Sequence, residues 1–105
     1  MTELEEFNYI NSLYDIYRVL FTEKQILVMD NYFKFNLSLS EIAHNLKISR
    51  SAVSDTINHV KIRLIDYEKK LNLLEHNNKI KNILETSEID DKIKKLILEE
   101  LYNGI

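Results

Sequence analysis

The chain has no cysteine and no proline, and its single glycine is Gly104. Without cysteine it can form neither disulfides nor thiolate metal sites, which suits a reducing compartment. Because proline and glycine are so scarce, β-turn chemistry is scarce too, and an all-α chain is favoured. The start of the chain is acidic, unlike a signal peptide, and no apolar run approaches the length of a membrane span. We therefore expect one all-helical domain over residues 1–105, located in the cytoplasm and not inserted in a membrane.

The charge is weakly acidic, with a formal net charge of −3 at pH 7. A nucleic-acid-binding domain is usually basic, so this balance argues against a simple binder of nucleic acid. Residues 38–72 are the exception, because their four acidic and six basic side chains give a net charge of +2. We expect few phosphate contacts and modest affinity if this segment binds DNA.

Residues 38–60 have the pattern of a helix-turn-helix. Two apolar stripes at helical spacing are joined by one apolar plug at the corner: Ile42, Ala43 and Leu46, then Ile48, then Val53, Ile57 and Val60. Ser38 and Glu41 have the spacing of a capping box, and Ser49 is placed to cap the second helix. This segment is the strongest fold signal in the chain.

The remaining elements follow from spacing and caps. A first helix is expected over 3–21, with an apolar face of Leu4, Phe7, Ile10, Leu13, Tyr17 and Leu20. Thr22 and Gln25 predict a capping box that opens a helix to about residue 33, burying Ile26, Met29, Tyr32 and Phe33. The second motif helix has no evident stop before about residue 74, with a break expected at 76–78. Ser87 and Asp90 suggest a last capping box, and Gly104 ends the last helix.

These elements predict a helix-turn-helix core over residues 22–60, no winged element, and a C-terminal helical extension over 61–105. The long helix is apolar on two sides, with Val53, Ile57, Val60, Leu64 and Leu71 on one and Ile62, Ile65 and Leu73 on the other. A helix apolar on two sides must be covered on both. Either the last helix folds back to close a hairpin within the chain, or a second copy covers the rest and residues 61–105 form a dimerisation surface.

Seven residues of the second motif helix are candidates for binding nucleic acid or a partner: Arg50, Ser51, Ser54, Asp55, Asn58, Lys61 and Arg63. Arg50 lies at the helix N-terminus, where it can meet a phosphate or a guanine edge. Asn58 could read adenine with its amide. Asp55 would repel phosphate and suits a basic protein surface equally well. For Arg50 and Asn58, the alternative is an ordinary surface residue, with Arg50 paired to a neighbouring acid.

Catalytic and metal sites have little support in the sequence. The three histidines, His44, His59 and His76, do not share the i, i+4 spacing of metal ligands. No glycine-rich loop is available to hold a nucleotide phosphate. Paired acids such as Asp90 and Asp91 fit helix caps better than acid–base chemistry. We expect a non-enzymatic protein with no cofactor and no metal.

Four segments in order carry a family resemblance: TEKQ at 22–25, SLSEIA at 38–43, ISRSAVSDTI at 48–57 and YEKKL at 67–71. Over residues 10–75 the chain resembles the YlxM-type helix-turn-helix proteins of bacteria, whose motif region is similar to region 4 of sigma factors. Two positions depart from the usual pattern. Ser51 replaces a glutamine in the recognition helix, and Lys47 stands where glycine is frequent at the turn.

The resemblance implies a small cytoplasmic accessory or regulatory protein of the signal recognition particle pathway. Its helix-turn-helix would bind the particle's protein or RNA. Two alternatives stay open. One is a sequence-specific transcription regulator, which requires a homodimer with recognition helices roughly 34 Å apart on duplex DNA. The other is a purely structural helical protein, because fold does not dictate function.

Overall fold

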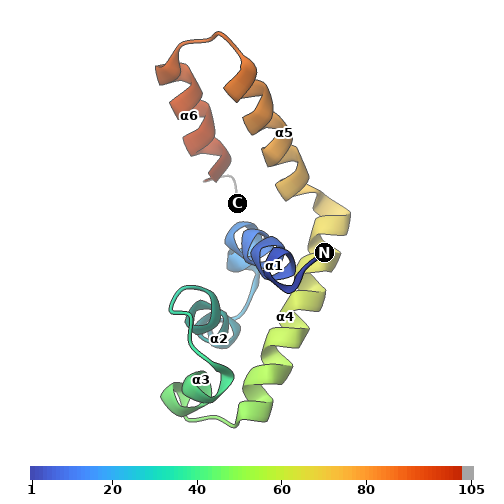
Figure 1. Cartoon of the computed structure of the whole chain (residues 1–105), viewed down its shortest axis with the longest axis vertical. Coiled ribbons are helices and arrows are strands. Elements are labelled where there is room, and N and C mark those ends of the chain that lie inside the picture. Colours follow the sequence, from blue (N-terminus) through green and yellow to red (C-terminus); the bar gives the residue numbers. More distant parts are fainter. Residues whose placement is uncertain (103–105) are drawn as a thin grey trace.

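The computed structural model describes residues 1–102 and consists of helices throughout. The elements are α1 (Glu3–Tyr17), the 3₁₀ turn η1 (Arg18–Leu20), α2 (Glu23–Phe33), α3 (Leu39–Leu46), α4 (Arg50–Leu71), α5 (Leu73–Thr86) and α6 (Asp91–Tyr102). Residues 1–102 contain no strand, so the all-α prediction is confirmed and no wing is present there. The molecule is elongated, 52 × 25 × 24 Å, with α1, α2 and α3 beside α4 and an α5–α6 hairpin beyond them (Figure 1).

Both motif helices and α2 begin where the sequence predicts. Thr22 with Gln25, and Ser38 with Glu41, form complete capping boxes in which each side chain bonds the other residue's backbone N–H. The Ser49 hydroxyl accepts the Ala52 N–H at 3.0 Å at the start of α4. The Ser38 N–H, which donates to Glu41, lowers the pKa of that carboxyl. Local side-chain chemistry therefore sets these three helix starts.

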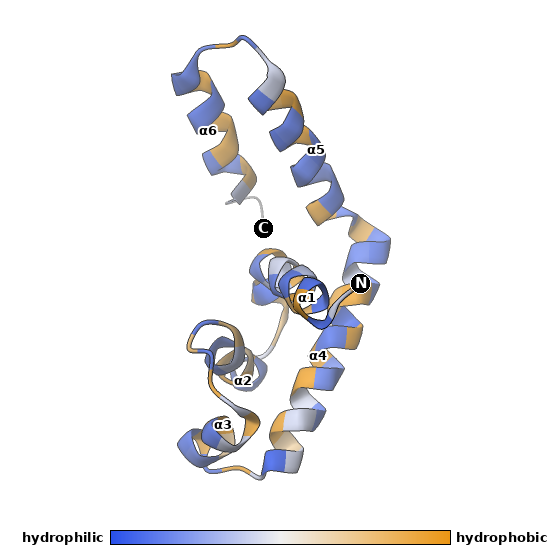
Figure 2. Cartoon of the chain, in the orientation of Figure 1, coloured by the Kyte–Doolittle hydropathy of each residue, from blue (hydrophilic) through white to orange (hydrophobic). Residues whose placement is uncertain are grey.

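The core lies where α1, α2 and α3 pack against the N-terminal two thirds of α4. Apolar and polar residues alternate along α4 in Figure 2, as expected of an amphipathic helix. Its core face is Val53, Ile57, Val60 and Leu64, all buried as predicted. The other buried side chains of this core are Ile10, Leu13, Tyr14, Tyr17, Phe21, Val28, Met29, Ile42 and Ala43. Among residues assigned to the α2 face, Ile26, Tyr32 and Phe33 are partly buried against this core.

The ends of the predicted first helix differ from expectation. Leu4 and Leu20 were expected on the buried face, yet they are 68% and 45% exposed. The chain tightens into a 3₁₀ turn at Arg18–Leu20, which shifts Leu20 off the α-helical face and places Phe21 in the core instead. Leu4 lies in the first turn of α1, beyond the part of the helix whose residues are buried.

The long helix ends earlier than predicted. It stops at Asn72, which adopts a left-handed conformation (φ 54°), and α5 then runs without interruption through 76–78. The expected break at 76–78 is therefore wrong. Asparagine tolerates the left-handed region better than most residues, so it can end a helix as glycine does. Leu71, expected on the core face, is 49% exposed at this bend.

The predicted capping box of the last helix is also wrong. The Ser87 hydroxyl donates back to the Leu84 carbonyl at 2.8 Å and so closes the end of α5. The Asp90 carboxylate accepts the Lys92 N–H at 2.7 Å, so Asp90 itself caps α6. The α6 helix packs beside α5 rather than folding over α4 (Figure 1). The predicted helix end at Gly104 lies outside the described residues.

A buried carboxylate holds the bend between α4 and α5. Glu68 Oε1 accepts the Tyr17 hydroxyl at 2.7 Å and the Leu74 N–H at 3.1 Å, and Oε2 accepts the Glu75 N–H at 3.2 Å. The Tyr17 oxygen in turn accepts the Leu73 N–H at 3.2 Å. Burial and the bond to Glu68 raise the pKa of Tyr17 to about 12. These bonds tie α1, α4 and the first amides of α5 at one point, which we call the Glu68 joint.

A second polar network connects α1 and η1 to α2. Asp30 Oδ1 accepts the Tyr14 hydroxyl at 2.7 Å, and the Arg18 guanidinium contacts both carboxylate oxygens, at 3.1 and 2.7 Å. The Arg18 bonds are the main reason that the pKa of Asp30 lies below its ordinary value. Burial and the bond to Asp30 raise the pKa of Tyr14. The network fixes how α2 lies against α1, and these two helices pack against α4 of the helix-turn-helix.

Candidate binding surface of the helix-turn-helix

The turn between α3 and α4 is three residues long and determines how the N-terminus of α4 is presented. Lys47 ends α3 in the left-handed conformation (φ 56°), and its N–H bonds back to the last turn of α3. The Ile48 N–H donates to the Ala43 carbonyl at 3.1 Å, and Ser49 is already extended. A lysine therefore occupies a conformation that glycine adopts more easily, and the turn forms nonetheless.

Arg50 stands at the open N-terminus of α4. It is exposed, and among residues 1–102 no carboxylate lies within 4 Å of its guanidinium. The structure therefore does not show the alternative in which Arg50 forms an ion pair with a neighbouring acidic residue. An exposed guanidinium beside the positive end of a helix favours an anionic group on the ligand.

Ser51, Asp55 and Asn58 form one outward face of α4. They are spaced at i, i+4 and i+7, and all three are exposed. Ser54 lies at the edge of this face and is half-buried. The structure thus brings together five of the seven predicted residues, Arg50 included, on the first two and a half turns of α4. We call this set, residues 50, 51, 54, 55 and 58, the recognition face.

Lys61 and Arg63 do not extend the recognition face as one basic patch. Two residues apart on a helix, they project to nearly opposite sides. The Lys61 ammonium lies 5.9 Å from the centre of the Tyr32 ring on α2. The Arg63 guanidinium lies 5.7 Å from the Tyr67 ring centre and donates to the Tyr67 hydroxyl at 3.0 Å. Each cation is thus held at a flank of α4, and Arg50 is the one cation of the recognition face itself.

Two apolar residues continue the recognition face toward the middle of α4. Ile62 and Ile65 follow Asn58 at i+4 and i+7 and are 68% and 42% exposed. Their apolar character was predicted, but their alignment with the binding residues was not. The surface is therefore polar near Arg50 and apolar beyond Asn58, which fits a protein or mixed ligand better than a phosphate backbone alone.

Sequence reasoning also missed a shallow polar hollow on α3, lined by Ser40, Glu41, His44 and Asn45. In helix-turn-helix proteins that bind DNA, the first motif helix crosses the phosphate backbone. The hollow lies on the corresponding helix of this chain, α3, and none of the residues of the recognition face lines it. The only signal for it in the sequence was the run of polar residues on the outer side of α3.

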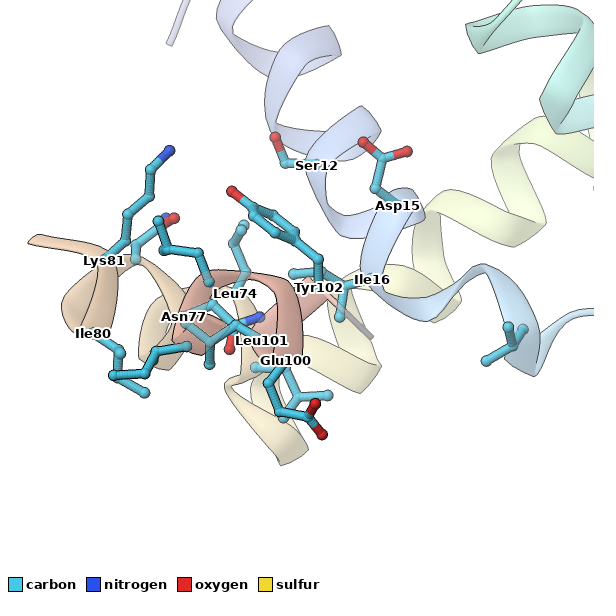
Figure 3. A pocket seen from close by; sticks show the side chains of 15 residues that line it. Ser12, Asp15, Ile16, Leu74, Asn77, Ile80, Lys81, Glu100, Leu101 and Tyr102 are labelled. Carbon is cyan, nitrogen blue, oxygen red and sulfur yellow. The ribbon is translucent and has the colours of Figure 1, made fainter. Parts of the chain in front are cut away.

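A larger cleft lies at the other end of the molecule, between α1, α5 and α6. Its volume is about 1130 Å³, and side chains of all three helices line it (Figure 3). Ser12 and Asp15 face it from α1, and Glu100 and Tyr102 border it from α6. No three His, Asp or Glu residues within the described part of the chain are grouped to hold a metal ion. None of the helices described is long and apolar enough to cross a membrane.

Comparison with known proteins places the chain in one family. The family model UPF0122, described as "Putative helix-turn-helix protein, YlxM / p13 like", matches residues 4–103. A UPF0122 protein of Clostridium kluyveri is 39% identical over 111 residues, covering 93% of this chain and 100% of that protein. One of Clostridium novyi is 41% identical, covering 88% and 71%. One of Bacillus cereus is 39% identical, covering 92% and 83%. No solved structure matches the chain.

Proposed function

This chain belongs to the YlxM/p13-like helix-turn-helix family, and from that premise we propose that it is a non-enzymatic accessory protein of the signal recognition particle pathway. It would act in the cytoplasm by docking its recognition face on the particle's protein or RNA. The pathway follows from the resemblance to YlxM-type proteins. The docking mode is supported by one observation above all, the exposed recognition face headed by Arg50.

The composition of the recognition face supports docking with few phosphate contacts. Arg50 supplies one cation, while Asp55 places a carboxylate in the middle of the same face. A carboxylate there repels a continuous phosphate backbone but can pair with a basic protein surface or accept from a cytosine amine. Ile62 and Ile65 add apolar area next to it. This mixture suits a folded ribonucleoprotein surface.

The test is a fluorescence-anisotropy titration of the labelled protein at two salt concentrations. The ligands are the purified particle, its separated protein, its RNA and a pool of duplex DNA. We expect the particle or one of its components to bind more tightly than the duplex pool. Arg50→Ala should weaken that binding several-fold and, for an RNA ligand, reduce the salt slope by about one.

Lys24→Ala is the matched control, because Lys24 is an exposed cation on α2, outside the recognition face. It should leave affinity and salt slope unchanged. Equal binding of the wild type and Arg50→Ala at both salt concentrations would remove Arg50 from the site. Loss of affinity in both variants would show that general charge, not the recognition face, drives binding.

A second candidate function is sequence-specific regulation of transcription by a homodimer. The exposed Asn58 amide and Arg50 guanidinium favour it, because these groups read adenine and guanine edges. It requires two recognition helices roughly 34 Å apart. Selective binding of a few duplexes, with none to the particle, would support this function and overturn the first.

A further inference from the structure

The α5–α6 hairpin has an apolar face that nothing in the described chain covers. Ile83 and Leu96 are 65% and 66% exposed, Ile93 is 50% exposed, and Ile80, which also borders the cleft between α1, α5 and α6, is 37% exposed. Ile89, in the connection between the two helices, is 41% exposed. Four large side chains on two short helices are more than the scattered single apolar residues of an ordinary surface.

Helical spacing puts these residues on one side of the hairpin. Leu84 is the buried residue of α5, and Ile97 is a half-buried residue of α6, so we take these positions to mark the sides on which the two helices face each other. Ile80 lies four residues before Leu84, and Ile83 lies one residue before it. In the same way, Ile93 lies four residues before Ile97, and Leu96 lies one residue before it. In an antiparallel helix pair, equal offsets from the facing positions fall on the same side. We call these residues, 80, 83, 93 and 96, the hairpin face.

Charges of opposite sign flank the hairpin face along α6. Lys92 lies one turn before Leu96 and Glu99 lies one turn after it, both on its outer edge. Neither forms an ion pair within 4 Å with another residue of the described chain. If a second α6 is laid antiparallel about a two-fold axis near Leu96, Lys92 of one copy meets Glu99 of the other. The same pair then forms twice, as an isologous contact requires.

We propose that the hairpin face is a self-association surface, on which a second copy of this chain docks with its α6 antiparallel. Leu96 and Ile93 would form the centre of the contact, Ile83 and Ile80 would widen it along α5, and the two Lys92–Glu99 pairs would fix its direction. This inference does not depend on the proposed function, because the hairpin lies at the opposite end of α4 from the recognition face (Figure 1). Only a few side chains of each copy form the contact, so we expect the dimer to depend on protein concentration.

Sedimentation velocity of the full chain, from about 1 to about 200 µM, tests the proposal. The wild type should shift from monomer to dimer within this range. Leu96→Glu and Ile83→Glu should each weaken the dimer at least about tenfold and leave the circular dichroism spectrum unchanged, because both side chains are exposed in the monomer. Ile62→Glu is the matched control, an equally exposed residue on α4, and it should still dimerise.

A charge exchange separates self-association from binding to any other partner. Lys92→Glu and Glu99→Lys should each weaken the dimer, and the double variant should restore it, because both partners of each pair then change sign. A wild type that stays monomeric at the highest concentration would overturn the proposal. So would dissociation by Ile62→Glu with no effect of Leu96→Glu, which would move the contact to α4.

Discussion

Removing the carboxylate of the Glu68 joint should destabilise the whole chain, although Glu68 lies far from the recognition face. In Glu68→Ala, the buried Tyr17 hydroxyl loses its acceptor, and the Leu74 and Glu75 amides lose theirs. A buried group left without its partner costs about 1–3 kcal/mol. Tyr17 is fully buried, Leu74 is half-buried, and Glu75 is exposed enough for water to replace its bond. We therefore expect a loss of about 3 kcal/mol in the free energy of unfolding.

Urea denaturation followed by far-ultraviolet circular dichroism measures this loss at neutral pH. Asp66→Ala is the matched control on the same helix, because Asp66 is exposed and, among residues 1–102, pairs only with Lys70 across one helical turn, at 3.0 Å. The control should stay within about 0.5 kcal/mol of the wild type. If Glu68→Ala is no more destabilising than Asp66→Ala, the Glu68 joint does not stabilise the fold.

A double-mutant cycle with Tyr17→Phe separates the joint from general packing. Tyr17→Phe keeps the ring in the core but removes the hydroxyl that donates to Glu68 and accepts from Leu73. The two variants should couple by about 1–2 kcal/mol, because they share one hydrogen bond. Hydrogen exchange should show the amides of residues 73–75 losing protection first in Glu68→Ala. Additive effects within error would contradict a shared network.

Three further perturbations test the supports of the motif. Asp30→Asn should cost about 1–3 kcal/mol at neutral pH. The lowered pKa of Asp30 makes its contribution full above about pH 4 and lost as the pH falls through the folded value, so acid titration should affect this variant less than the wild type. Lys47→Gly should raise stability by up to about 1 kcal/mol at its left-handed position, measured by thermal melting. Ser38→Ala should lower stability by about 1 kcal/mol through the lost cap of α3, with Ser40→Ala as the control.

The sequence was sufficient for the elements whose boundaries depend on nearby residues. Capping boxes and apolar spacing act within four residues, so Thr22, Ser38 and Ser49 could be assigned as helix starts without the structure. The same holds for the core face of α4, since Val53 to Leu64 follow one stripe. In these places local preference and tertiary packing favour the same structure, so the sequence pattern predicts that structure correctly.

The sequence failed where a distant residue decides the local conformation. Nothing near Asn72 marks a helix end as glycine would, and the bend is held by Tyr17 from α1, 51 positions before Glu68. The Ser87 spacing fits a capping box equally well, but Ser87 bonds backward into α5 instead. For the candidate site, helical spacing gave the recognition face and also separates Lys61 from Arg63, which lie two residues apart. It could not give the aromatic ring that each cation meets, Tyr32 on α2 for Lys61 and Tyr67 for Arg63.

The Glu68 joint links the two surfaces proposed here, because α4 carries the recognition face at one end and meets the hairpin at the other (Figure 1). If two copies associate through the hairpin face, the direction of each hairpin fixes where the two Arg50 residues lie relative to one another. A homodimer that binds two half-sites of duplex DNA needs the distance between its two recognition helices held near one DNA turn, roughly 34 Å. Docking on a single site of the particle does not need it. Loosening the joint with Glu68→Ala should therefore impair paired half-site binding far more than binding to the particle, which makes this one variant a discriminator between the two functions.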